Sequence, residues 1–149
     1  MPAPRGIPDV GMDRTPVQNA ARLAGIVFLL AGIAGFIPGI TTNLYDGLEF
    51  AGDNGNAEVL GLFEVSVLHN IVHGLFGVAG LALAATASGA RTFLIGGGAI
   101  YLLLAAIQVV GAGDWVPLVS PDLWLHLVLG VGMVGLGVAL TRAGPRRMS

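Results

Sequence analysis

The chain has 149 residues, enough for one domain. Only 11% of them are charged and 54% are apolar, whereas soluble domains carry about 25% charged residues. This composition excludes an ordinary soluble fold. The absence of cysteine excludes disulfides and thiolate metal sites, and the net charge of −2 argues against nucleic acid as a partner.

The chain begins with a stretch that has no hydrophobic period. Residues 1–16 contain four of the eight prolines, and we expect a disordered cytoplasmic tail there. Four uncharged apolar runs follow, and each has about the 20 residues that a helix needs to span a bilayer. The four transmembrane helices are therefore expected at about 20–40, 62–87, 91–112 and 122–142. They make up a domain of residues 17–142, and residues 143–149 form a second cytoplasmic tail.

The charged residues are divided between the two sides of these helices. All seven basic residues are arginines, and they fall on the side of the helices that holds the two tails and the turn between the second and third helices. The loop at 41–60 is acidic and contains no basic residue. Basic segments stay in the cytoplasm. The pattern thus predicts a multi-pass membrane protein with both termini in the cytoplasm and the 41–60 loop outside.

Small residues predict how the helices pack. Lipid gives no hydrophobic drive for helix association, so close contact over glycine must supply it. The glycines expected at helix contacts are Gly32, Gly35, Gly77, Gly80, Gly130 and Gly137. A further glycine face at Gly132 and Gly135 points to a homo-oligomer or a larger membrane complex. The expected fold class is all-α, an integral membrane four-helix bundle in contact with the lipid bilayer.

A faint internal repeat suggests a duplicated helix hairpin. The segment His73-Gly-Leu-Phe-Gly-Val in the second apolar run is similar to His126-Leu-Val-Leu-Gly-Val in the fourth. Each of these runs follows a helix that is entered just after an arginine, Arg22 or Arg91. Such a pattern fits two hairpins related by an axis along the membrane normal.

One cluster of polar residues lies inside the apolar runs. His69, Asn70 and His73 fall within one turn of the second run, and His69 and His73 share a face because they are four residues apart. Gln108 and His126 come from the neighbouring runs, and all five are expected in the outer half of the membrane. The usual glutamate of a two-histidine zinc motif is absent, so we expect no metal site.

The cluster admits two interpretations. On the favoured one, neutral histidines and Asn70 tie helices together by hydrogen bonds. On the other, the ionisable groups mark a ligand site or proton path, with haem or quinone ahead of zinc. A haem would need histidines from different helices, such as His73 and His126. No serine, histidine and carboxylate are placed to converge, so we expect no enzyme.

Three hypotheses for function follow. The first is a non-enzymatic structural or accessory subunit of a membrane assembly, which needs no cofactor. The second is a haem- or quinone-binding redox protein that uses the intramembrane histidines. The third is a small transporter or proton conduit, which ranks last because the one mid-chain helix breaker, Pro38, lies at the outer end of its helix.

The segment LGLFEVSVLHNIVHGLFGVAGL, after a first run that ends in GFIPG, resembles a family of small bacterial membrane proteins. It is the domain of unknown function 4383 family, found mostly in actinobacteria. The resemblance covers about residues 16–142 and implies a four-helix membrane protein without a known activity. Ser66 stands where the family is expected to have an asparagine.

Overall fold

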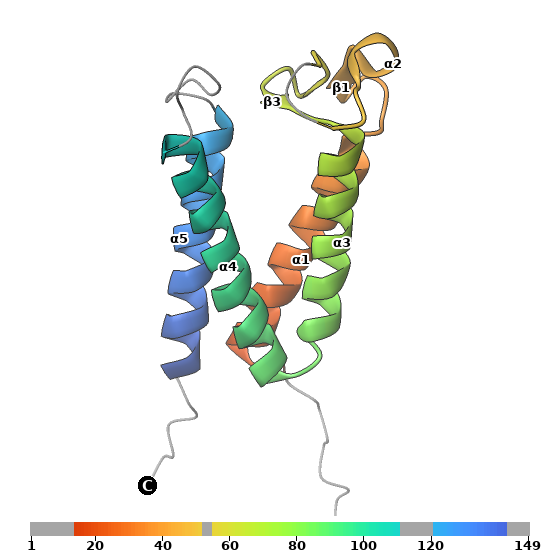
Figure 1. Cartoon of the computed structure of the whole chain (residues 1–149). Coiled ribbons are helices and arrows are strands. Elements are labelled where there is room, and N and C mark those ends of the chain that lie inside the picture. The colour runs from red at the N-terminus through yellow and green to blue at the C-terminus, as the bar shows by residue number, and fades with distance from the viewer. Residues whose placement is uncertain (1–13, 52–54, 111–120, 143–149) are drawn as a thin grey trace, which may run out of the picture.

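The structure, a computed structural model, describes residues 14–51, 55–110 and 121–142, and within them the chain is mostly helical (Figure 1). Both expected tails lie largely outside the described residues. The elements are, in chain order, α1 (Pro16–Ala34), β1 (Thr41–Thr42), α2 (Leu44–Gly47), β2 (Glu58–Val59), β3 (Phe63–Glu64), α3 (Val67–Leu83), α4 (Ala87–Val110) and α5 (Pro121–Arg142).

Helix α1 has strong signals at both ends. Thr15 caps its first turn in a capping box with Gln18, and Pro16 occupies the first helical position, where its missing N–H costs nothing. The helix ends at Ala34 rather than at residue 40. Pro38 cannot continue the helical ladder, and Thr41 Oγ1 instead donates to the carbonyl of Ala34 at 2.9 Å.

The segment expected as a plain loop contains a small antiparallel sheet in the order β1-β2-β3. Thr41 pairs with Val59, and Val59 pairs with Phe63 across a tight turn in which Leu60 and Gly61 have positive φ. The fold is therefore not purely α-helical. Because residues 58–64 form strands, α3 begins at Val67 and not at residue 62.

The turn between α3 and α4 lies four residues earlier than the sequence suggested. Helix α3 ends at Leu83 rather than at residue 87, and α4 begins at Ala87 rather than at residue 91. Thr86 Oγ1 accepts a hydrogen bond from the N–H of Gly89 at 3.0 Å, which supports the first turn of α4. Helix α5, at 121–142, lies within one residue of its expected range.

The long helices pack as two antiparallel hairpins, α1 with α3 and α4 with α5, which converge at the lower end in Figure 1. A Cβ on Gly32 would lie 2.6 Å from the carbonyl oxygen of Asn70, and one on Gly130 would lie 3.0 Å from that of Gly98. Such close approach is how helices associate in lipid. The other expected packing glycines that face neighbouring elements at short range are Gly35, Gly77, Gly80 and Gly137.

The two hairpins repeat the same contacts. A Cβ on Gly25 would meet the carbonyl of Gly77 and the N–H of Leu81, both at 2.9 Å. A Cβ on Gly98 would meet the carbonyl of Gly130 at 2.8 Å and the nitrogen of Val134 at 2.9 Å. Each histidine of the sequence repeat stands four residues before its glycine, so His73 and His126 are equivalent.

The arginines of the repeat do not share this equivalence. Arg22 stands three residues before Gly25, whereas Arg91 stands seven residues before Gly98. The contacts of the two glycines therefore make Gln18, and not Arg22, the counterpart of Arg91. An alignment of the two helices on their arginines is therefore about one turn out of register with the glycine contacts.

Three of the described helices are long and apolar enough to cross a membrane: Pro16–Ala34, Ala87–Val110 and Pro121–Thr141. No more than 33% of the residues in any of these spans are buried within the chain, so the rest of their surface needs lipid or a partner. Helix α3 has 17 residues and falls short of this length. A four-span bundle is thus not established by helix length alone.

Candidate functional site

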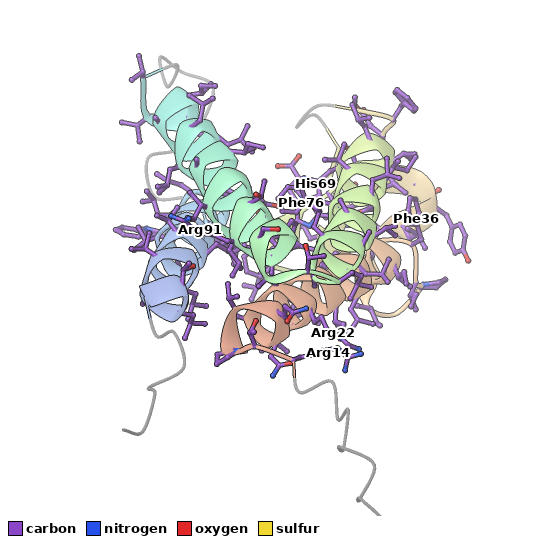
Figure 2. The ribbon with its side chains drawn as sticks, turned by 90° about the horizontal axis from the view of Figure 1, so that it is seen from below. Arg14, Arg22, Phe36, His69, Phe76 and Arg91 are labelled. Carbon is purple, nitrogen blue, oxygen red and sulfur yellow. The ribbon has the colours of Figure 1, made fainter. Side chains whose placement is uncertain are left out.

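The two histidines of α3 lie side by side on the face that α3 turns toward α4 and α5. Their rings are stacked, with centroids 4.3 Å apart and planes 24° apart. Figure 2 shows His69 and Phe76 in the space between α3 and α4. Ser66 caps α3 by accepting from the N–H of His69 at 3.2 Å. Asparagine is an equally good cap, so the serine here preserves the helix start on which both histidines depend.

Tyr101 of α4 links the histidines of the two hairpins. Its hydroxyl lies 3.4 Å from His73 Nε2, and its ring packs edge-on against His126 with centroids 5.3 Å apart. Tyr101 is only 5% exposed. It was not part of the polar cluster predicted from the sequence. Its position seven residues before Gln108 puts the two side chains on one face of α4, but this spacing does not show which helix that face meets.

His126 and Gln108 form a polar pair inside the second hairpin. His126 Nδ1–H donates to Gln108 Oε1 at 3.1 Å, which leaves the other ring nitrogen of His126 as an acceptor. Because Tyr101 touches both imidazoles, His73 and His126 lie at nearly the same level of the bundle. This is the arrangement that the sequence repeat implies.

Asn70 points toward α1 and packs against Gly35, whose lack of a side chain makes the room. It is 1% exposed, and neither Oδ1 nor Nδ2 has a hydrogen-bond partner. A buried polar group without a partner costs about 1–3 kcal/mol. Asn70 also belongs to the lining of a small cavity, together with His69, His73 and His126.

Three adjoining cavities of about 80, 150 and 370 Å³ meet at His69 and His126. The largest lies between α3 and α4. The apolar residues along its opening are Leu68, Val72, Ile100 and Leu104, each at least 41% exposed. The cavity of 150 Å³ is polar and includes Glu64, Gln108 and Asp122. Together they form a cleft, which we call the outer cleft.

The cleft ends below on a layer of aromatic rings. Phe28 packs on Phe76 with centroids 4.9 Å apart, and Phe76 packs on Phe93 at 5.0 Å. Beneath this layer lie the fully buried Leu94 and the alanines of the lower core. The described part of the chain therefore offers polar groups above this layer and a tightly packed apolar core below it.

The structure brings all five predicted polar residues to the outer cleft. His69, Asn70, His73 and His126 line the smallest cavity, and Gln108 lines its neighbour. Within the described residues, no group of three or more histidine or acidic side chains is arranged to hold a metal ion. What the cleft offers chemically is a set of imidazole, phenol, amide and carboxyl groups beside aromatic and aliphatic walls.

Comparison with known proteins identifies the family. The family model described as "Domain of unknown function (DUF4383)" matches residues 18–139, and the chain belongs to this family. This confirms the resemblance seen in the second apolar run. The match extends from α1 to α5 and includes every residue of the outer cleft named above. Neither the curated proteins nor the solved structures contain a significant match.

Proposed function

We propose that the chain crosses the bacterial cytoplasmic membrane four times and acts there as a non-enzymatic accessory protein that binds a small lipid-soluble molecule in the outer cleft. Connectivity supports the fourth span. Helix α1 ends at the upper end of the bundle and α4 begins at the lower end, so if both cross the membrane the chain must return between them (Figure 1). Helix α3 is the segment that makes this return.

Charge supports an orientation with both termini in the cytoplasm. Arg14, Arg22 and Arg91 belong to the lower ends of α1 and α4, which Figure 2 views from below. The acidic residues of the upper end that the structure describes are Asp46, Glu49, Glu58, Glu64 and Asp122. Segments rich in arginine are retained inside.

A labelling experiment tests this orientation. The natural sequence has no cysteine, so a single cysteine at Tyr45, in α2, reports on the upper end of the bundle. A single cysteine at Ser88, in the first turn of α4, reports on the lower end. A membrane-impermeant thiol reagent should label Tyr45→Cys on intact cells and label Ser88→Cys only after lysis. The reverse pattern would invert the proposed topology.

The observation that carries ligand binding is the meeting of three cavities at His69 and His126, with further polar groups from α3 and α4. If these groups served only to tie helices together, they would fill the space between them. Among the described residues that line the cleft, Ser66 is the one serine or threonine. Its hydroxyl oxygen already accepts a hydrogen bond from the backbone N–H of His69 in the first turn of α3, and this supports a non-catalytic role. The packed layer at Phe28 and Phe76 gives no support to a conduit.

Haem fits the cleft less well than a smaller ring does. Two axial histidines would have to face each other across a flat slot. His69 and His73 are stacked face to face, and the Tyr101 ring packs against both His73 and His126, in space that a macrocycle between them would need. The residues present therefore do not favour bis-histidine haem ligation.

A second candidate, a structural subunit of a membrane assembly, is favoured by glycines that pack against nothing in the described part of the chain. A Cβ on Gly96, Gly132 or Gly135 would meet no atom within 4 Å. Glycine faces of this kind are where membrane helices associate. Gly135→Leu should then release a second copy or a co-purifying chain without lowering the melting temperature.

Blocking the cleft tests the ligand proposal. Leu104 lines the largest cavity, whereas the adjacent Leu103 is 60% exposed and lines none of the three. Native mass spectrometry of protein purified in mild detergent should find a retained small molecule in the wild type and in Leu103→Trp. Leu104→Trp should lose it. Equal retention in both variants, or none in the wild type, would refute binding in the cleft.

A further inference from the structure

We infer that the largest cavity of the outer cleft binds the ring of a lipid-soluble quinone or its hydroquinone, an inference that rests on the proposed ligand site. The cavity of about 370 Å³ has two kinds of wall. Aliphatic side chains from α3 and α4 line its opening, and imidazole and phenol groups line its inner end. A ligand with an apolar tail and a polar, flat head matches this division.

The opening indicates entry from the bilayer. Leu68 and Val72 of α3 stand opposite Ile100 and Leu104 of α4, and all four are 41–51% exposed. Surfaces of this kind between membrane helices face acyl chains. A ligand that enters here leaves its tail among lipids and brings only its head to the histidines.

The inner end suits a flat ring that carries oxygens. The Tyr101 hydroxyl lies 3.4 Å from His73 Nε2, longer than the about 2.7–2.8 Å of a well-formed hydroxyl hydrogen bond. This weak pairing is easily exchanged for a ligand oxygen. His126 retains one acceptor nitrogen while its Nδ1–H is bound to Gln108. Quinone carbonyls accept from such donors, and hydroquinone hydroxyls donate to such acceptors.

Aromatic neighbours favour a planar head over a flexible one. The stacked His69 and His73 form a flat surface, and Phe76 lies beside Tyr101 with centroids 5.6 Å apart. Planar rings gain from offset and edge-on contacts in such surroundings. A saturated headgroup with the same oxygens would not gain these contacts.

Two further observations narrow the ligand to a neutral one. The adjoining polar cavity contains the carboxylic acids Glu64 and Asp122, and no arginine lines any of the three cavities. An anionic phospholipid headgroup would lack a cation and meet acidic groups. The phenol of Tyr101 and the imidazoles of His73 and His126 are hydrogen-bonding groups that suit a ring carrying two oxygens at opposite positions.

The test uses the full chain in lipid nanodiscs. A short-chain benzoquinone and a short-chain naphthoquinone are titrated while the melting temperature is followed. The wild type should show a saturable rise with at least one of them, because a ligand that binds only the folded state stabilises it. In nanodiscs enriched in phosphatidylglycerol and without quinone, the melting temperature should not rise.

Variants locate the site. Tyr101→Phe keeps the buried ring and removes only the hydroxyl, and it should weaken quinone binding about tenfold through the lost hydrogen bond. Tyr45→Phe is the matched control, because Tyr45 is 84% exposed in the upper segment, and it should bind like the wild type. Leu104→Trp, which closes the cavity by bulk, should abolish the rise even if Tyr101→Phe folds poorly.

The outcomes separate this inference from the proposed function. If the wild type retains a small molecule that Leu104→Trp loses, but neither quinone raises the melting temperature, the cleft binds another ligand and only the quinone inference fails. If no molecule is retained and no quinone binds, both fail. A rise that is equal in the wild type and in Leu104→Trp would place the quinone in bulk lipid and overturn the inference.

Discussion

The two hairpins repeat the same glycine contacts but differ in the side chains that they carry at the upper end. Phe28 of α1 packs on His73 with ring centroids 5.7 Å apart, and Tyr101 of α4 packs on His126 at 5.3 Å. The phenyl ring has no polar atom, whereas the phenol reaches across to His73 of the other hairpin. The repeated packing provides the frame, and one hydroxyl group connects its halves.

The two hairpins also differ two turns after Phe28 along α1. Gly35 of α1 leaves room for Asn70, which α3 sends toward α1 and which finds no partner. In the second hairpin Gln108 is the counterpart of Gly35. It forms a hydrogen bond with His126, the counterpart of His73. Small residues in one hairpin thus admit a buried amide, while larger residues in the other build the wall of the cleft. A repeat can therefore conserve backbone contacts while its polar positions diverge.

The largest expected effect comes from filling the repeated glycine contact. A Cβ on Gly77 would meet the carbonyl oxygen of Gly25 at 2.7 Å, whereas one on Gly130 would meet the side chain of Leu102 at 2.7 Å. Backbone cannot move aside as a side chain can. Gly77→Leu should therefore lower the free energy of unfolding by about 3 kcal/mol or more, and Gly130→Leu by about 1–3 kcal/mol.

Denaturation in detergent measures both changes. The control is Leu75→Ile, because Leu75 is 64% exposed on the outside of α3 and should change little. If Gly130→Leu lowered the free energy of unfolding more than Gly77→Leu, the expected difference between a backbone neighbour and a side-chain neighbour would be wrong. If Leu75→Ile cost as much as Gly77→Leu, the packing face of α3 would be misassigned.

An intermediate effect is expected from exchanging the aromatic residues of the two hairpins. Phe28 is 2% exposed, so the hydroxyl of Phe28→Tyr would be forced into a packed site at a cost of about 2 kcal/mol. Tyr101→Phe loses only the hydrogen bond to His73, at a cost of about 1 kcal/mol. Melting curves of both variants should preserve this order, and the opposite order would show that the hydroxyl of Tyr101 is the main link between the hairpins.

The smallest effect is expected at the polar pairs. Gln108→Met removes the partner of His126 and keeps the length of the side chain, and hydrogen bonds between membrane helices average about 0.6 kcal/mol. His73→Gln keeps a hydrogen-bonding group beside Tyr101 and should cost a similar amount. Unfolding free energies that fall by more than about 2 kcal/mol would show that these groups hold the helices together. They would then serve as structural ties rather than as the walls of a binding site.

Part of the site was predictable because it depends on helical spacing alone. His69 and His73 had to share a face of one helix, and the glycines four residues after His73 and His126 marked equivalent positions. Tyr101 could not be assigned in the same way. Its role depends on how far α4 stands from α3, and that distance is set by contacts of Phe76, Phe93 and Gly97 from several elements.

The sequence by itself determined the apolar character and approximate positions of the long helices and the division of charge between their ends, because these follow from composition and from the length of apolar runs. Only the tertiary structure decided that residues 41–64 include a small sheet and that α1 stops at Ala34. It also decided that Asn70 turns toward Gly35 while the histidines turn toward Tyr101. These outcomes depend on pairings between segments distant in the chain, and no local pattern specifies which segments will meet.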